Sequence, residues 1–224
     1  MPSSSLYHRL IEANAEDWQA YIGHRFVRGI QNGTLPKSAF RYYLIQDYLF
    51  LIHFARAYAL AAYKAQDLEG IRAAAESLRI ITEVEMGLHI KFCQSWGLTE
   101  SEMQSTPEAV ETMAYTRYVL ECGLAGDVLD LHVALAPCLC GYAEIGKWLA
   151  SDPATQIEGN PYREWIEMYA SDEYQSGSAA AIEMLDRLFE QRSGMGRMND
   201  LIRIFGQATR LESQFWQMGV DAAH

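Results

Sequence analysis

Cysteine is scarce in this 224-residue chain, which has four such residues and no Cys-x-x-Cys pair. They are Cys93, Cys122, Cys138 and Cys140. No histidine lies at the spacing of a zinc finger, and four cysteines over this length do not make a disulfide scaffold. We therefore expect free thiols, a reducing cytoplasmic location and no structural metal site.

Positive charge and long apolar runs are also in short supply. Lysine and arginine number 18 against 29 acidic residues, which gives a net charge of −11 and no basic stripe. Such a surface repels phosphate backbones, so we expect no nucleic-acid partner. No uncharged apolar run approaches the ~18 residues that cross a bilayer. Residues 1–5 lack the basic and apolar regions of a signal peptide, so we expect no membrane partner.

Strand signals are nearly absent, whereas apolar residues recur three and four apart through most of the chain. Helices are predicted at 4–20, 23–31, 37–65, 67–95, 107–122, 126–150, 161–171, 177–192 and 197–219. Asn32-Gly33 indicates a helix stop, and Thr99 to Glu102 has capping-box spacing. The turns at 123–126 and 193–196 are too short for domain linkers. The chain is therefore predicted to be all-α, a single helical bundle over residues 1–224.

The stretch from Tyr42 to Tyr63 has almost no polar face. A helix that is apolar on nearly all sides lies at the centre of its domain or at a subunit interface. We expect both, and therefore a homo-oligomer.

Three ionisable residues stand out because they lie in apolar helices: Asp47, Glu212 and Cys138. Asp47 would cost several kcal/mol (~3–5) if it were buried without a partner. Asp47 either has a functional role or is a structural carboxylate paired with an arginine or a hydroxyl group. Glu212, among apolar neighbours, becomes a usable general acid or base if its site is dry, or is simply a surface residue of an amphipathic helix.

Cys138 follows a proline inside a helical pattern. Pro137 removes a backbone donor and should kink the helix, and Gly141 allows a close approach to the backbone. Cys138 and Tyr142 are four apart and share a helix face. A lone cysteine is more often a small buried apolar residue, and we keep that interpretation for Cys140.

Tyrosine is abundant, with 13 residues. Tyr115 and Tyr169 lie on separate predicted helices. Tyrosines can line a slot for a flat heteroaromatic ring, stacking on its face while the hydroxyl bonds its edge. They can equally be core residues with satisfied hydroxyls.

Several segments resemble, in the same order, the TenA / thiaminase II family. They are FVRGIQNGTL (26–35), FRYYLIQDY (40–48), MAYT (113–116), PC to YAEIG (137–146), PYREWI (161–166) and LE to FW (211–216). The matches run from about residue 20 to the C-terminus. Each match is only modestly specific, but together the matches are strong evidence for the resemblance.

The resemblance implies a fold similar to haem oxygenase without haem or another cofactor, assembled as a homotetramer. The family hydrolyses thiamin or 4-amino-5-aminomethyl-2-methylpyrimidine to 4-amino-5-hydroxymethyl-2-methylpyrimidine, which is salvaged for thiamin synthesis. Cys138 matches the family's nucleophile, Asp47 its pyrimidine-binding carboxylate and Glu212 its acid/base. Tyr115, Tyr142 and, after a loop of variable length, Tyr169 match substrate-binding tyrosines. Phe50 stands where some members have tyrosine, which keeps stacking but loses a hydroxyl.

Two other functions are compatible with a helical fold. A di-iron oxygenase would need several inward carboxylates and histidines, often as Glu-x-x-His pairs. The chain has no such pair, and Glu85 and His89 four apart supply only two ligands. A non-catalytic regulatory or pyrimidine-binding role is the third reading, although the acidic balance argues against direct DNA contact.

Overall fold

The computed structural model describes residues 4–192 and 194–223, and in this part of the chain the regular elements are all helical. In chain order they are α1 (Leu6–Ala13), α2 (Ala15–Ile22), α3 (Arg25–Gln31), α4 (Lys37–Lys64), α5 (Leu68–Arg79), the π-helix η1 (Ile80–Glu85), α6 (Met86–Ser95), α7 (Glu100–Ser105), α8 (Val110–Ala125), α9 (Val128–Ser151), α10 (Arg163–Ala170), α11 (Asp172–Arg192) and α12 (Arg197–Asp221). The predicted all-α class is confirmed. The features predicted at 1–5 and 193–196 lie partly outside the described residues.

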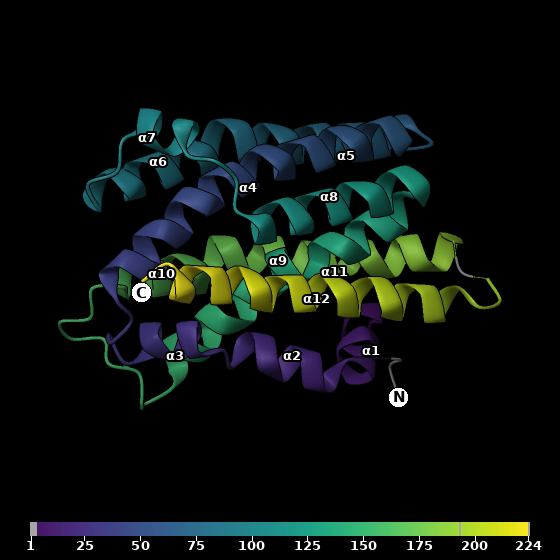
Figure 1. Cartoon of the computed structure of the whole chain (residues 1–224). Coiled ribbons are helices and arrows are strands. Elements are labelled where there is room, and N and C mark those ends of the chain that lie inside the picture. The colour runs from purple at the N-terminus through teal and green to yellow at the C-terminus, as the bar shows by residue number, and fades with distance from the viewer. Residues whose placement is uncertain (1–3, 193, 224) are drawn as a thin grey trace.

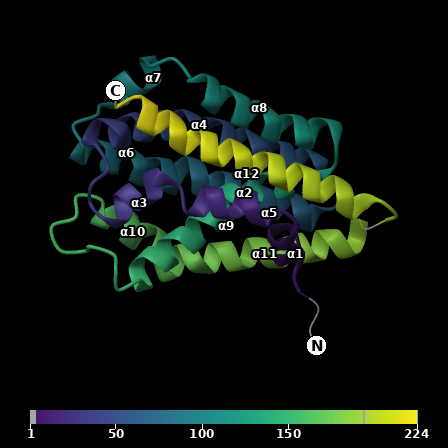
Figure 2. The same cartoon turned by 60° about the horizontal axis from the view of Figure 1, so that its bottom comes forward.

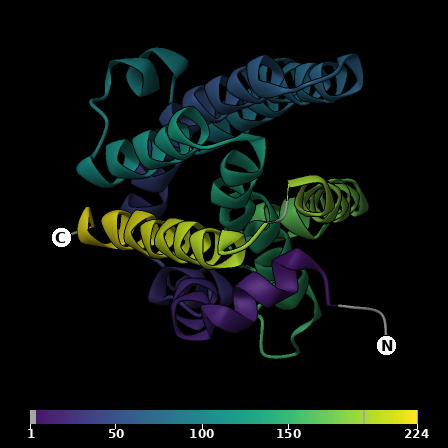
Figure 3. The same ribbon diagram turned by 90° about the vertical axis from the view of Figure 1, so that its right-hand side faces the viewer.

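Two long helices, α9 and α12, form the centre of the bundle (Figure 1). α9 packs against α4, α8, α10, α11 and α12. α2 lies against both α12 and α9 (Figure 2). Seen end on, the α4, α5 and α8 group lies on one side of α12 and the N-terminal helices on the other, with α11 to the side (Figure 3). The centre of the molecule is therefore reached by side chains from several helices.

The central helix α9 begins at a reciprocal cap. The Asp127 carboxylate accepts from the Leu129 and Asp130 amides, and Asp130 accepts from the Asp127 amide. α9 then continues as one helix through Pro137. It is long and apolar enough to cross a membrane, but 78% of its apolar window is buried inside the protein, as in a core helix.

Gly141 explains how α2 approaches α9 so closely. A Cβ there would lie 2.5 Å from the Tyr21 ring, so only glycine fits without displacement. The Tyr21 hydroxyl donates to the Pro137 carbonyl at 3.1 Å. The close approach predicted at Gly141 is confirmed, and the neighbour is a buried tyrosine.

Several predicted boundaries are confirmed and others are wrong. α3 ends at Asn32-Gly33, where Gly33 has a φ of 67°, and the Thr99 capping box starts α7. The predicted helix 4–20 is instead two helices, because the Asn14 amide turns to the Leu10 and Ile202 carbonyls. The turn predicted at 123–126 is helical through Ala125. α11 begins five residues before the predicted residue 177, and α8 runs over 110–125 rather than 107–122.

An aromatic cluster around Trp216 fills the core beside α9 and α12. The Trp216 ring centroid lies 4.8 Å from that of Phe26, 5.0 Å from that of Tyr142 and 5.3 Å from that of Tyr43. Trp216 is fully buried, one turn after Glu212 on the same helix. Rigid ring packing therefore fixes the part of α12 that carries Glu212.

Candidate active site

Glu212 of α12 is a buried acid with a tyrosine partner. Its side chain is 1% exposed, and Tyr115 Oη from α8 donates to its Oε1 at 2.9 Å. Burial raises the pKa of Glu212 to about 8, although the bonds from Tyr115 and the Cys138 thiol act to lower it. The interpretation of Glu212 as a surface residue is wrong, since the carboxyl is enclosed and holds a proton at neutral pH.

This raised pKa makes stability depend on pH. Between the ordinary pKa of 4.5 and about 8, the native carboxyl keeps a proton that the unfolded chain releases. The free energy of unfolding therefore declines as pH rises through that window. Glu212→Gln cannot ionise, so at pH 8 we expect its free energy of unfolding to exceed that of wild type by ~2–4 kcal/mol and its unfolding temperature to be higher, with the difference gone near pH 4.5. Thermal unfolding at both pH values is the measurement, and a pH-independent difference contradicts the assignment.

Cys138 of α9 lies beside Glu212 and remains partly accessible, whereas Cys140 is buried on the same helix. Cys138 thus keeps partial exposure although Glu212 beside it is buried. Burial, followed by the negative charges of Glu212, Asp47 and Glu85, raises the pKa of the Cys138 thiol well above its usual range. In the free protein the surroundings of Cys138 therefore disfavour the thiolate.

Asp47 of α4 is buried and is held by a histidine and a tyrosine. His89 Nδ1 and Tyr43 Oη each lie 3.5 Å from Asp47 Oδ2. His89 Nε2 is 2.9 Å from the Leu44 carbonyl, so it carries a proton there, and Nδ1 can donate to Asp47 only in the doubly protonated ring. Burial raises the pKa of Asp47, and the His89 charge and the Tyr43 bond oppose that rise. The carboxylate still has acceptor capacity for a ligand.

Aromatic rings flank these three ionisable groups. The Tyr142 ring centroid is 4.9 Å from that of Tyr169, and Phe50 packs 5.2 Å from Tyr115. Gly146 lets α10 approach α9, because a Cβ there would lie 2.6 Å from the Tyr169 backbone. The structure thus brings together all seven predicted residues, Asp47, Phe50, Tyr115, Cys138, Tyr142, Tyr169 and Glu212, from five helices.

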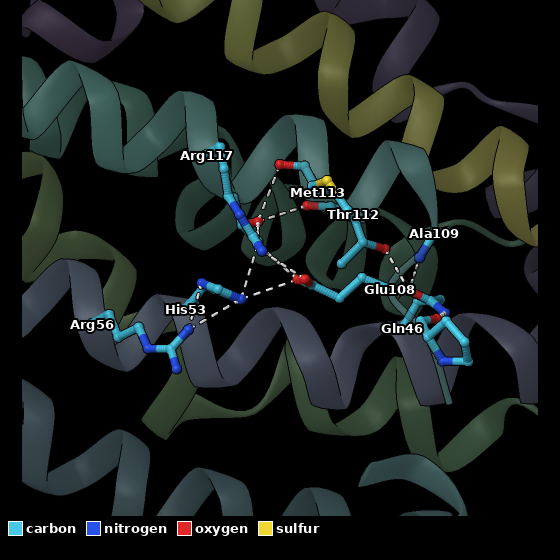
Figure 4. Close-up of polar contacts among 10 residues, drawn as sticks. Gln46, His53, Arg56, Glu108, Ala109, Thr112, Met113 and Arg117 are labelled. Atoms are coloured by element: carbon cyan, nitrogen blue, oxygen red, sulfur yellow. Dashed lines mark hydrogen bonds and ion pairs between the residues drawn. The ribbon is translucent and has the colours of Figure 1, made fainter. Parts of the chain in front are cut away.

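A polar network holds α4 and α8 in register beside the site (Figure 4). The fully buried Gln46 amide accepts from the Ala109 amide and the Thr112 hydroxyl, and donates to the Pro107 carbonyl. Two turns farther along α4, His53 meets the Glu108–Arg117 ion pair: His53 Nε2 is 3.0 Å from Glu108 and 2.9 Å from Arg117. The network therefore fixes Asp47, the residue after Gln46, relative to Tyr115 on α8.

Two hollows lie away from the Cys138–Glu212 pair. One is lined by Tyr58 and His132 with Asp67 and Arg192, and none of the seven predicted residues lines it. A smaller one lies behind Phe50, beside His53 and Thr116. Neither joins a thiol to carboxyl groups, so we place the site at Cys138.

Sequence reasoning missed Tyr43 as a partner of Asp47 and treated Glu85 and His89 as a surface pair. His89 instead contacts Asp47, and Glu85 is half-buried on the same side of α6 and η1. Their spacing of four residues was the available signal. Within residues 4–192 and 194–223, no three His, Cys, Asp or Glu side chains are grouped to hold a metal ion.

Comparison with known proteins agrees with this geometry. The chain is 38% identical to an aminopyrimidine aminohydrolase of Halalkalibacterium halodurans, over 91% of this chain and 90% of that protein. A TenA family transcription regulator of Silicibacter sp. TM1040 has a crystal structure that superposes with a TM-score of 0.91 at 42% identity, covering 98% of both chains. A Shewanella denitrificans domain with a heme oxygenase-like fold, at 14% identity, has a TM-score of 0.73 over 94% of this chain and 90% of that domain, which shows the fold alone. The family description TENA/THI-4/PQQC matches residues 12–222, and the chain belongs to that family.

Proposed function

We propose that the protein is an aminopyrimidine hydrolase that releases 4-amino-5-hydroxymethyl-2-methylpyrimidine from 4-amino-5-aminomethyl-2-methylpyrimidine or from thiamin, for thiamin salvage. The observation that carries the proposal is the Cys138–Glu212–Tyr115 cluster with Asp47 nearby. A thiol, a carboxyl with a pKa of about 8 and a second carboxylate are the groups that this chemistry requires. The aminopyrimidine aminohydrolase named above supports the substrate class.

The reaction breaks a carbon–nitrogen bond at a methylene on an aromatic ring. Cys138 adds to the ring carbon beside the carbon that carries the methylene, and the adjacent ring nitrogen takes a proton from Glu212. Ring electrons then expel the leaving group, and water adds to the exocyclic methylene. As the C–S bond breaks, Glu212 returns a proton to sulfur and takes the ring proton back. Covalent addition replaces one difficult displacement with easier steps.

Proton transfer within the Cys138–Glu212 pair explains how a thiol of raised pKa can attack. Glu212 gives its proton to the ring nitrogen while it receives the thiol proton on its other oxygen. No free thiolate needs to accumulate in the empty site, where burial and nearby carboxyl groups oppose it. The pKa of about 8 for Glu212 suits a group that both donates and accepts near neutral pH.

Asp47 is proposed to hold the amidine edge of the ring, where an exocyclic amine meets a ring nitrogen. We expect Asp47→Asn to weaken binding of the hydroxymethylpyrimidine product by ~10–100-fold, because a charge-assisted bond is lost and the amide cannot match the same donor pattern. Isothermal titration calorimetry is the measurement, with Asp67→Asn, the N-cap of α5, as a surface control. Unchanged affinity in Asp47→Asn would remove Asp47 from ring recognition.

Steady-state release of the hydroxymethylpyrimidine from both substrates tests the function and ranks them by kcat/KM. A protein that binds the pyrimidine but releases nothing would be a sensor, as the regulator description of the Silicibacter protein suggests. The net charge of −11 does not favour DNA contact in such a role.

We also propose a cytoplasmic homotetramer. Five of the exposed large apolar side chains, Leu68, Ile71, Ile80, Val84 and Leu88, lie on the consecutive elements α5, η1 and α6. Burying this surface in an assembly removes apolar area from water. Light scattering at micromolar concentration distinguishes a tetramer from a dimer or monomer.

A further inference from the structure

Glu85 is a carboxylate beside the proposed site that the mechanism above does not use. It closes the π-helix η1, a type of element that often marks functional positions. Its side chain is half-buried, and among residues 4–192 and 194–223 it forms no hydrogen bond or ion pair that would neutralise it. One turn later His89, at the spacing that shares a helix face, contacts Asp47. Glu85 therefore lies on the face of η1 and α6 that meets the site.

The groups around Glu85 locate it within the site. Its negative charge raises the pKa values of Cys138, Tyr169 and Tyr58, and Asp47 raises the pKa of Glu85 after burial does. Glu212 does not feature among the charges that act on Glu85. Together with the contact of His89, four residues later, with Asp47, these charges place Glu85 near Asp47 and Cys138, with Glu173 also acting on it.

The substrate's own geometry identifies what must lie on that side. In the proposed orientation the 4-amino group is at Asp47, the carbon attacked by Cys138 is C6, and the ring nitrogen at Glu212 is N1. Position 5 lies between C4 and C6, so its methylene and leaving group project between Asp47 and Cys138. Glu85 lies near this part of the site and, unlike His89, bears a carboxylate that no described cation pairs with.

We propose that Glu85 is a specificity-determining residue that binds the leaving group and selects substrates whose leaving nitrogen carries positive charge. The proposal rests on the hydrolase function proposed above. Both an aminomethyl group, protonated at neutral pH, and a quaternary nitrogen of a thiazolium fit this requirement. The hydroxymethyl product is neutral, so the same carboxylate would not retain it.

The charge also matters for the bond that breaks. When the carbon–nitrogen bond cleaves, its electron pair goes to nitrogen, so a protonated amine departs as neutral ammonia. An unprotonated amine would have to depart as an amide anion. A carboxylate beside the ammonium stabilises the protonated form and so keeps the substrate in the state that can react. Glu85 remains an anion throughout and exchanges no proton in this scheme.

The test compares two ligands that differ in charge and bind the same ring site. Calorimetry is done with Cys138→Ser protein, which does not turn over, with and without Glu85→Gln. The ligands are aminomethylpyrimidine at pH 7 and the neutral hydroxymethyl product. We expect Glu85→Gln to raise the Kd of the cation about 30-fold and to leave that of the product within twofold. Glu83→Gln is the matched control: Glu83 is exposed on the same π-helix and bonds Arg79, so it should change neither Kd.

The outcomes separate this proposal from the hydrolase function. Equal weakening of both ligands would assign Glu85 a structural role and overturn the proposal, as would unchanged binding of the cation. A protein that binds neither ligand would overturn both proposals. A wild type that shows the charge-dependent split in binding but releases no product would retain the Glu85 assignment and refute hydrolysis.

Discussion

Replacing Cys138 by serine is expected to reduce kcat for pyrimidine release on the order of 10⁴-fold while the Kd of the hydroxymethyl product stays within a few-fold. Serine keeps the size and the partly accessible position of the side chain, but its hydroxyl is a much weaker nucleophile toward a ring carbon. The carboxyl groups that recognise the ring remain in place. Steady-state kinetics and product calorimetry on one preparation give both quantities.

Cys140→Ala is the matched control for this experiment. Cys140 lies two residues later on α9, is 1% exposed and is buried away from Cys138, so its loss should leave kcat within about twofold. Thermal unfolding of both variants separates a catalytic loss from a folding defect. Full activity of Cys138→Ser would exclude the covalent mechanism, because no other cysteine lies beside Glu212 in the described part of the chain.

The fold was predictable from the sequence because helical periodicity is a local property. Apolar residues three and four apart locate α4, α9 and α12 whatever their neighbours are. Helix ends that depend on contacts with residues distant in the sequence were not predictable. Asn14 ends α1 with an amide that reaches Ile202, nearly 190 residues away, and no local pattern encodes that contact.

The candidate site likewise combines residues that the sequence pattern predicts with contacts that it cannot predict. Asp47 and Glu212 stood out because a charge in an apolar helix is costly, and the structure finds both buried. Their partners depend on helix packing: Tyr115 reaches Glu212 across a helix interface, and His89 reaches Asp47 from α6. The direction of the pKa shift of the Cys138 thiol also could not be predicted, because it depends on burial in the folded core and then on three carboxyl groups from other elements.

Glu212→Gln is expected to lower kcat/KM by about 10³-fold and to change the shape of the pH profile. In wild type the protonated carboxyl supplies the ring proton, so kcat/KM should fall as pH rises through about 8, the pKa of the free enzyme's Glu212. Glutamine supplies no transferable proton, so the variant's residual activity should lack this alkaline limb. Rates measured between pH 6 and pH 9.5 give the comparison.

Tyr115→Phe provides the sharper test, because it alters the pKa of Glu212 without removing the carboxyl. The bond from Tyr115 Oη lowers that pKa, so its loss should move the alkaline limb to higher pH. A structural role for Glu212 would lower activity in both variants with no movement of the limb. If the essential form were the carboxylate, with Glu212 acting first as a base toward the Cys138 thiol, kcat/KM would rise with pH through the pKa of Glu212, and that acid limb would be the one that moves to higher pH in Tyr115→Phe. Which limb of the pH profile moves in Tyr115→Phe therefore decides whether Glu212 must be protonated, to donate to the ring, or ionised, to take the proton from sulfur.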